Sequence, residues 1–240
     1  MESIIEINDL EVKYGDFTVL EDINLNIPEG QITAILGGSG CGKTTLLKSL
    51  LRLQPIAQGS IRIFQTAVDS PEFRSQLTKI GMVFQNGALL NSLSVADNIS
   101  IPLKQHTALP DKIINQIIDA KLKLVNLEDT GSLLPSELSG GMKKRAAVAR
   151  AIALDPELLF CDEPSAGLDP ITSASLDNLL VKLKQQLEMT IVIVTHELAS
   201  VRRIADNIVF LHDGRILFQG SYEQIQHSNI DEIKQFFSSN

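Results

Sequence analysis

The sequence has little cysteine, and the cysteines that it has stand apart. Cys41 and Cys161 lie in otherwise ordinary segments and form neither a metal-ligand cluster nor a disulfide framework. A chain of 240 residues needs no such staple, because a chain of this size buries about 70–75% of its unfolded surface. The scarcity of cysteine therefore favours a reducing compartment and a fold held by its hydrophobic core.

Basic side chains are also scarce. The 21 lysines and arginines are outnumbered by 29 aspartates and glutamates, which gives a formal net charge of -8. A protein that wraps nucleic acid through its phosphates is normally basic. We therefore expect no nucleic-acid partner.

Long apolar runs are missing as well. The runs "LLFC" (158–161) and "IVIV" (191–194) are far shorter than the roughly 20 residues that a membrane helix needs. The acidic start "MESIIEINDLEV" lacks the basic and apolar regions of a signal peptide. Any work at a membrane is therefore expected to go through a partner.

What the sequence does contain is an alternation of strand and helix patterns. The segment 4–30 alternates apolar and polar residues with turn signals between them, which predicts short antiparallel strands. Continuous apolar runs predict strands buried on both faces at 32–36, 80–84, 158–162 and 191–195. Leucines spaced three and four apart predict a helix over 176–187. The alternation favours an α/β fold with a mainly parallel sheet.

Two other segments have a different character. Asp213-Gly214 stands between two apolar runs and predicts a β-hairpin over 207–220. Residues 93–137 contain three prolines and are typical of helices without strands. We expect one domain over 1–240, with an inserted helical subdomain at approximately 93–150.

Residues 37–44, "GGSGCGKT", match the phosphate-loop pattern G-x-x-x-x-G-K-[ST], and "GGSGCGKTT" extends to residue 45. The glycines let backbone N–H groups approach phosphate oxygens, and the following helix adds its positive N-terminal end. Lys43 supplies a charge to the terminal phosphates, and Thr44 supplies a hydroxyl to Mg²⁺. The alternative, a chance glycine turn, is disfavoured by the strand before the loop and the helix after it.

Two acids end the predicted strand at 158–162. Asp162 can reach the Mg²⁺ of a phosphate loop from this position. Glu163 can orient or deprotonate an attacking water. The alternative is a pair of exposed acids that cap the strand.

A second glycine pair lies about a hundred residues later, in "LSGGM" (138–142). Ser139 is a favourable N-cap for the helix that follows, and Gly140 and Gly141 leave the backbone bare. The arrangement suits an anion site, and it equally suits a capped helix in a core. The spacing alone does not decide between the two.

Six motifs occur in order: "GGSGCGKTT", "VFQNG", "LSGGM", "LLFCDE", "SAGLDP" and "VTHE". In this the chain resembles, over nearly its whole length, the nucleotide-binding subunit of an ABC transporter. The motifs correspond to Walker A, the glutamine loop, the signature loop, Walker B, the D-loop and the histidine switch. The resemblance implies a P-loop NTPase (ABC ATPase) core with a mainly parallel sheet, an N-terminal antiparallel β subdomain and an inserted α-helical subdomain.

The resemblance also implies an assembly. Two subunits form a head-to-tail homodimer, and the signature loop of each closes over the ATP held by the other's Walker A loop. The second glycine pair then serves the partner's nucleotide. The dimer docks on an integral-membrane permease, through the region around the glutamine loop.

Site residues follow from the resemblance, position by position. The implied cofactors are ATP and Mg²⁺. The implied catalytic residues are Glu163, His196 and Gln85. The implied magnesium ligands are Thr44, Gln85 and Asp162. The implied nucleotide-binding residues are Tyr14, Gly37, Gly38, Ser39, Gly40, Cys41, Gly42, Lys43, Thr44, Thr45, Ser139, Gly140, Gly141 and Asp169.

Three of these residues have structural alternatives. His196 ends a predicted buried strand and could be a satisfied core histidine. Asp169 could be a turn acid before Pro170, where the resemblance implies an aspartate that communicates across the dimer. Tyr14 could be an aromatic on an edge strand, where the resemblance implies stacking on adenine.

The chain departs from many ABC ATPases at two positions. Met142 stands where glutamine is common, and Gly38 stands where proline or histidine is common. Neither change removes a catalytic group. Cys41 lies in a phosphate loop at a helix N-terminus, where we expect a lowered thiol pKa.

Finer matches resemble the ATPases of Mla-type lipid transporters, which are linked to MCE proteins. They include Gly87-Ala88-Leu89, Met142 and Ile171. This implies phospholipid transport that maintains lipid asymmetry, an MCE-domain lipid-binding protein, a small STAS-type subunit, and a peripheral position on the cytoplasmic face of the inner membrane. The alternative is an ATPase of another importer or exporter, for amino acids or lipoproteins. The short Gln85-to-Leu138 spacing and the single cassette disfavour DNA-repair and translation ATPases.

Overall fold

The structure is a computed structural model that describes residues 2–239, and it divides into two compact units. The first unit comprises the chain up to Leu77 and from Thr190 onward, and the second comprises Thr78–Met189. The expected helical subdomain at 93–150 falls within the second unit, which also holds two strands and a further helix. No helix within residues 2–239 is long and apolar enough to cross a membrane.

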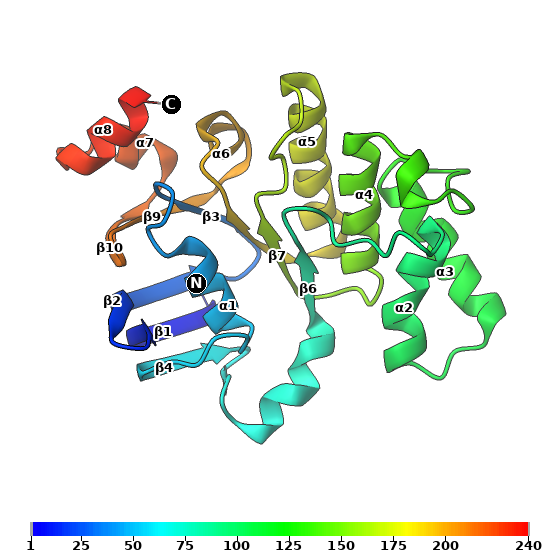
Figure 1. Ribbon diagram of the computed structural model, residues 1–240, viewed down its shortest axis with the longest axis horizontal. Helices are drawn as coiled ribbons and strands as arrows, with labels where there is room; N and C mark the ends of the chain where they lie inside the picture. The colour runs from blue at the N-terminus through cyan, green and yellow to red at the C-terminus, as the bar shows by residue number, and fades with distance from the viewer. Residues whose placement is uncertain (1, 240) are drawn as a thin grey trace. The chain divides into compact units, whose positions relative to one another are not determined.

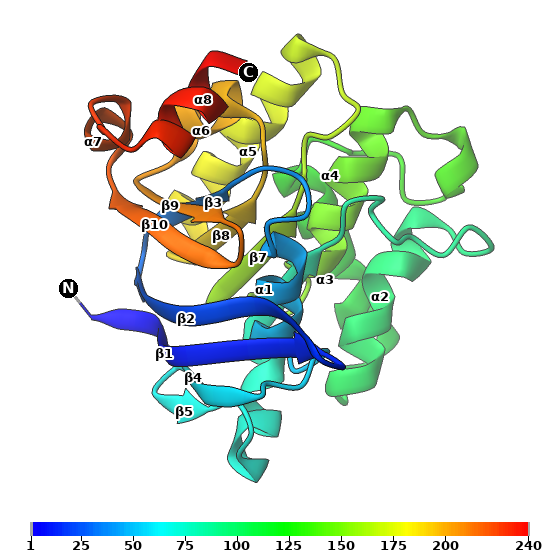
Figure 2. The same cartoon turned by 60° about the vertical axis from the view of Figure 1, so that its left-hand side comes forward.

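The first unit contains an antiparallel sheet of order β2-β1-β4-β5. Figure 2 shows β1, β2 and β4 side by side. The strands are β1 (Ser3–Tyr14), β2 (Phe17–Pro28), β4 (Gln58–Ile63) and β5 (Thr66–Ala67). Antiparallel pairing is confirmed, but the prediction of short strands is wrong, because β1 and β2 each have 12 residues. Asp9 and Asp22 have φ values of 47° and 52°, and the pairing shifts register nearby, so these turn-type residues occur within continuous strands.

A second group of strands in this unit has the order β10-β9-β3-β8. Its members are β3 (Ile32–Leu36), β8 (Thr190–Val194), β9 (Asn207–His212) and β10 (Arg215–Gly220). β3 is parallel to β8 and β9 and is buried along its whole length, as its continuous apolar run predicts. The β9–β10 hairpin is confirmed, and Asp213 and Gly214 turn it with φ values of 43° and 74°.

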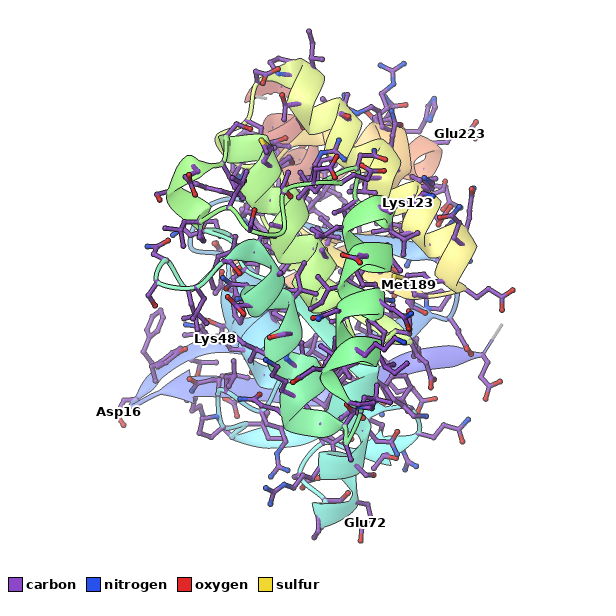
Figure 3. All side chains as sticks on the ribbon, turned by 90° about the vertical axis from the view of Figure 1, so that its right-hand side faces the viewer. Asp16, Lys48, Glu72, Lys123, Met189 and Glu223 are labelled. Carbon is purple, nitrogen blue, oxygen red and sulfur yellow. The ribbon has the colours of Figure 1, made fainter. Side chains whose placement is uncertain are left out.

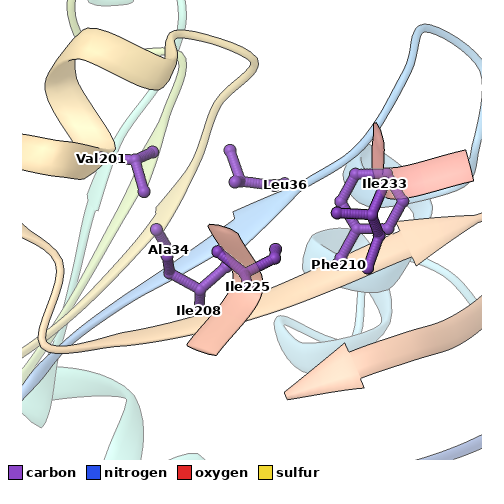
Figure 4. Packing of buried hydrophobic residues seen from close by; sticks show 7 residues of the cluster. All are labelled: Ala34, Leu36, Val201, Ile208, Phe210, Ile225 and Ile233. Atoms are coloured by element: carbon purple, nitrogen blue, oxygen red, sulfur yellow. The ribbon is translucent and has the colours of Figure 1, made fainter. Parts of the chain in front are cut away.

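Helices cover one face of these parallel strands. They are α6 (Leu198–Ile204), α7 (Tyr222–Gln226) and α8 (Asp231–Ser239). Figure 4 shows the buried cluster that joins them to β3 and β9: Ala34, Leu36, Val201, Ile208, Phe210, Ile225 and Ile233. Phe236 of α8 meets Phe210 edge to face, with ring centroids 5.2 Å apart. The parallel strands are therefore fixed by a continuous apolar core.

The second unit has two parallel strands, β6 (Ile80–Val83) and β7 (Leu158–Asp162). Both are confirmed as strands, and β7 is buried from Leu158 to Cys161. The prediction that β6 is buried on both faces is wrong, because Ile80 and Met82 are only half-buried. β6 is the last strand in the sheet order, and an edge strand needs less apolar cover.

The other elements of the second unit are helices: α2 (Val95–His106), α3 (Asp111–Leu124), α4 (Gly140–Ala151) and α5 (Pro170–Leu187). Short 3₁₀ helices occur at Pro71–Lys79, on the boundary of the two units, and at Pro135–Glu137. Figure 1 shows α2, α3 and α4 together, and α4 contacts α2, α3, α5 and β6. The described residues 93–137 form no strand, which agrees with the prediction.

Candidate functional site

The phosphate-type loop lies between β3 and α1 (Lys43–Leu50) in the first unit. Gly40 and Gly42 have φ values of 80° and 107°, which side-chain-bearing residues rarely adopt. A Cβ at Gly37 would lie 2.1 Å from the carbonyl oxygen of Leu211. Gly38 has no such neighbour within 4 Å, so its glycine is not required by packing. The fold therefore requires glycine at Gly37, Gly40 and Gly42, but not at Gly38.

Lys43 closes the loop on itself. Its Nζ donates hydrogen bonds to the carbonyl oxygens of Gly37, at 2.7 Å, and Gly38, at 2.9 Å. Ser39, Gly40 and Thr44 are exposed around it. The result is an ammonium group ringed by backbone at the start of α1, an arrangement that suits the binding of an anion.

Cys41 corrects the expectation of a lowered thiol pKa. Burial raises the pKa of the Cys41 thiol, and this outweighs the lowering by the charge of Lys43. The side chain is only 6% exposed, so ionisation loses more solvation than the nearby charge returns. Cys41 is therefore a small buried residue in the loop and not a reactive thiol.

His196 follows the end of β8, beside the strand that leads into the phosphate loop. β3 and β8 are parallel, with Ile35 opposite Val194, so Gly37 and His196 both follow the carboxyl ends of adjacent strands. His196 is exposed, which argues against a satisfied core histidine. The first unit thus places an imidazole at the same sheet edge as the phosphate loop.

Tyr14 ends β1 and pairs with Phe17 across the hairpin. Figure 3 labels Asp16 at the tip of this hairpin. β1 lies inside its sheet, so Tyr14 is not on an edge strand. Directly paired residues project from the same face, and both rings are exposed, Phe17 by 72%. Phe17 is a candidate base-binding residue that the sequence patterns did not single out, although its two-residue separation from Tyr14 across a Gly-Asp turn could have indicated it.

In the second unit, the polar residues after β6 and β7 lie at one sheet edge. Val83 is opposite Cys161 in this parallel pair, so Gln85, which follows β6, and Asp162, the last residue of β7, lie at the carboxyl ends of neighbouring strands. Glu163 comes next and has a φ of 45°, a strained left-handed conformation for glutamate. Strain of this kind is concentrated at functional sites.

Lys144 of α4 is a residue that the sequence patterns missed. It is buried, and its Nζ donates hydrogen bonds to the carbonyl oxygens of Gln85 and Glu163, the latter at 3.3 Å. The glutamine-loop backbone and the Glu163 backbone therefore meet at one ammonium group. Only the tertiary fold could show this, since Lys144 is 59 residues from Gln85.

The signature-type loop begins α4, as predicted. Ser139 is the N-cap, and its hydroxyl accepts a hydrogen bond from the Met142 N–H at 3.3 Å. In the first turn of α4, Gly140 is exposed and Gly141 is half-buried. The same residues therefore cap the helix and leave at its start an accessible backbone that suits an anion.

Asp169 is the N-cap of α5. Its side chain accepts hydrogen bonds from the N–H groups of Ile171 and Thr172, both at 3.0 Å. The hydrogen bonds from Thr172 and, more weakly, from Ile171 lower the pKa of the Asp169 carboxyl. The structure thus assigns Asp169 a local capping role, and its role across a dimer stays a prediction.

The candidate magnesium ligands offer only oxygen donors. Thr44 supplies a hydroxyl, Asp162 a carboxylate and Gln85 an amide oxygen, which is the hard donor set that Mg²⁺ prefers. Gln85 and Asp162 come from adjacent strand ends, which fits a shared ion. Residues 2–239 contain no group of three or more His, Cys, Asp or Glu side chains able to hold a metal by themselves.

Together, the phosphate loop after a buried parallel strand and the two acids at the end of β7 define a P-loop NTPase. The ABC transporter family matches residues 20–166 of the chain. The chain belongs to this family, and it is an ATP-binding subunit that hydrolyses ATP for transport. Proteins of this kind bind ATP and ADP, dimerise and associate with permease subunits.

Individual relatives cover almost the whole chain. It is 40% identical to the intermembrane phospholipid transport system ATP-binding protein MlaF of Haemophilus influenzae, over 98% of this chain and 90% of that protein. It is 38% identical to the probable ribonucleotide transport ATP-binding protein mkl of Mycobacterium tuberculosis, over 98% of this chain and 66% of that protein. A solved dimeric ATP-binding cassette, in a post-hydrolysis state with ADP and phosphate, is similar with a TM-score of 0.81 and 29% identity, covering 90% of this chain and 98% of that one.

Proposed function

We propose that this chain powers phospholipid transport between the inner and outer membranes and so maintains lipid asymmetry. The observation that carries the proposal is the 40% identity, over nearly the whole chain, to a protein named for intermembrane phospholipid transport. Gly87-Ala88-Leu89, Met142 and Ile171 are the residues of this chain that resemble the Mla-type branch. The subunit would act at the cytoplasmic face of the inner membrane as a peripheral protein.

A second candidate is the ATPase of another ABC importer or exporter. The 38% identity to a relative named for ribonucleotide transport favours it almost as strongly. Amino acids or lipoproteins are further cargoes of this alternative. Cargo is chosen by membrane components outside this chain, so the choice between the two rests on a cellular experiment.

The proposed site is shared between two copies of the chain. Lys43 and the backbone of residues 37–45 hold the phosphates of ATP, with Tyr14 against the base. Ser139, Gly140 and Gly141 of the second copy close over the same nucleotide, and Asp169 communicates between the copies. A two-fold dimer completes two such sites through one self-complementary interface.

Hydrolysis in this proposal needs an oriented water and a neutralised phosphate. Thr44, Asp162 and Gln85 would hold Mg²⁺, which when bound offsets the charge of the phosphates. Glu163 accepts a proton from the attacking water or orients it. His196, exposed at the end of β8, contacts the terminal phosphate.

Docking on the permease uses the surface around the glutamine loop. Phe84 and Leu90 on either side of Gly87-Ala88-Leu89 are large apolar residues that are 41% and 50% exposed. Small and apolar residues between them would let a helix of the permease approach closely. Further partners of the proposed system are an MCE-domain lipid-binding protein and a small STAS-type subunit.

Glu163→Gln tests the proposed chemistry. The variant should bind ATP, lose turnover by on the order of 100-fold or more, and form a stable dimer with Mg²⁺-ATP on size-exclusion chromatography. Glu157→Gln is a matched control, because Glu157 precedes the opposite end of the same strand and pairs with Lys79. Native turnover in Glu163→Gln would remove Glu163 from the mechanism.

Deletion of the gene tests the cargo. Loss of phospholipid transport should raise phospholipid in the outer leaflet of the outer membrane and make cells sensitive to detergent with chelator. A plasmid copy should restore resistance, and a Glu163→Gln copy should not. Intact lipid asymmetry together with lost uptake of a small solute would favour the second candidate while leaving the ATPase assignment in place.

A further inference from the structure

Helix α4 carries a buried cation that none of the proposed chemical steps uses. Lys144 is only 8% exposed in the second unit. Burial of an ammonium group is costly unless strong acceptors surround it. Its acceptors therefore indicate what the residue does.

Lys144 contacts the backbone of two residues with proposed roles in hydrolysis. Its Nζ donates to the carbonyl oxygen of Gln85, which follows β6, and to that of Glu163, which follows β7. The Glu163 carbonyl also accepts the Ala166 N–H at 3.2 Å, which closes the turn after β7. One ammonium group therefore fixes two separate loops relative to each other.

Further along α4, Arg150 holds the next part of the glutamine loop. Its guanidinium donates to the carbonyl oxygens of Ala88, at 2.6 Å, and Gly87, at 2.8 Å. Gly87 and Ala88 have φ values of 72° and 49°, so the backbone turns here. Lys144 and Arg150 therefore attach both ends of the glutamine loop to α4.

The same helix starts at the signature loop. Ser139 caps α4, and Lys144 lies five residues further on, within a continuous helix that ends at Ala151. A helix moves as a rigid rod over this length, which is about 18 Å. A displacement of the glutamine loop is therefore carried both to Glu163 and to the signature loop.

We propose that Lys144 is a positioning residue for hydrolysis, which sets the Glu163 turn relative to the glutamine loop and couples both to the signature helix. The inference rests on the proposed roles of Gln85 and Glu163. Lys144 itself is expected to touch neither nucleotide nor water. Its loss should therefore lower kcat for ATP more than it changes KM.

The test compares two buried lysines of the same unit. Lys144→Met removes the ammonium group at similar volume, and Lys121→Met does the same on α3, where Lys121 is 5% exposed and pairs with Asp155. ATPase kinetics and thermal unfolding of the full chain are measured for both. Lys144→Met should lose kcat by on the order of 10- to 100-fold, because small misplacements of reacting groups have effects of this size. Lys121→Met should lower the unfolding temperature and keep kcat within about twofold.

Lys144→Gln is the conservative variant, since its amide can still donate to a backbone carbonyl. Its kcat should lie between those of Lys144→Met and the native chain, and its KM should stay within about threefold. If Lys144→Met does not fold, Lys144→Gln decides the matter. A native kcat in Lys144→Met, a native kcat in Lys144→Gln where Lys144→Met does not fold, or an equal loss of kcat in Lys121→Met overturns the proposal.

Glu163→Gln, measured alongside, separates this inference from the proposed site. If Glu163→Gln keeps its turnover, the proposed role of Glu163 fails, and the positioning role fails with it. If Glu163→Gln loses turnover while Lys144→Met keeps it, only the positioning role is wrong. Loss in both variants, with the KM of Lys144→Met little changed, supports both.

Discussion

The phosphate loop at 37–42 and the glycine pair at 140–141 both precede a helix, but their glycines meet different demands. In the first loop, Gly40 and Gly42 have left-handed backbones, and Gly37 faces the Leu211 carbonyl oxygen. The glycine pair does not have positive φ, and it lies in the first turn of α4. The backbone of the first loop needs glycine, whereas the backbone of the glycine pair has a helical conformation that other residues also adopt.

The two glycines of the pair also differ in the space around them. A Cβ at Gly141 would lie 2.5 Å from Cγ2 of Thr172 on α5, so a side chain there must displace the Thr172 side chain. A Cβ at Gly140 would meet only Leu168, at an ordinary 3.6 Å. The chain itself has room for a side chain at Gly140. A substitution at this position therefore tests whether the second loop binds a partner's nucleotide.

The largest expected effect lies in the first loop. Gly37→Ala places a methyl group against a backbone oxygen that cannot easily move, so we expect a loss of about 3 kcal/mol in the free energy of unfolding together with loss of ATP binding. Gly38→Ala, one residue on and with open space, should change the free energy of unfolding by less than about 0.5 kcal/mol. Urea denaturation and nucleotide titration measure both. Equal destabilisation by the two variants would contradict the packing argument.

The second prediction tests whether the two loops serve one shared site. Lys43→Ala damages a chain's own phosphate loop, and Ser139→Ala damages the loop that the chain lends to its neighbour. Each variant alone should hydrolyse ATP poorly. Random pairing of the two makes about half of the dimers mixed, each with one intact site, so about a quarter of native activity should return.

The control for this mixture is each variant mixed with itself at the same total concentration. Recovery depends on one intact site being able to hydrolyse ATP without the other. If Ser139→Ala alone has native ATPase activity and native dimer formation, the second loop does not serve a nucleotide, and it only caps its helix.

A third and smaller effect distinguishes the two interpretations of the glycine pair, as a site for the partner's phosphate or only as the start of a capped helix. Alanine in place of Gly140 favours the helix by up to about 1 kcal/mol, so the Gly140→Ala chain should unfold at a higher urea concentration. Its ATPase activity should nevertheless fall, because the methyl group stands where the partner's phosphate would approach. Gly131→Ala is a control in the same unit, with nearest neighbours at 3.4 and 3.6 Å. Higher stability with unchanged ATPase activity in Gly140→Ala would favour the capped helix alone.

The smallest predicted effect concerns the thiol in the first loop. Burial raises the pKa of the Cys41 thiol above its ordinary value of 9.0, so below that pH the thiol is protonated in both folded and unfolded chains. As pH rises above 9.0, the unfolded chain ionises while the folded chain does not, so stability is lost. Urea denaturation at pH 8 and pH 10 should show a smaller loss for Cys41→Ser than for the native chain.

Alkylation of the native protein provides an independent measurement of the same thiol. A maleimide should modify Cys41 much more slowly than it modifies the urea-unfolded chain at the same pH, since the thiolate is the reactive form. Rapid modification of the native chain at neutral pH would restore the expectation of a lowered thiol pKa in the phosphate loop.

Local patterns predicted much of the fold because their causes are local. The apolar run at 32–36 predicted a buried strand, and Asp213-Gly214 predicted a hairpin, since each depends on a few neighbouring residues. Ser139 was predicted as an N-cap on the same basis. The predictions failed where neighbours in space decide. β6 is half-covered because it is an edge strand. The predicted short strands are long because β1 and β2 continue to pair through register shifts near Asp9 and Asp22.

The sequence by itself determined the order and spacing of six motifs, and hence the family and the residues proposed for ATP hydrolysis. The tertiary structure alone decided that Cys41 is desolvated, that Thr172 packs against Gly141, and that the Lys144 ammonium joins the backbones of Gln85 and Glu163. The physical reason is distance along the chain. Backbone conformation follows from adjacent residues, whereas burial, collision and hydrogen bonding between segments exist only after packing has brought distant atoms together.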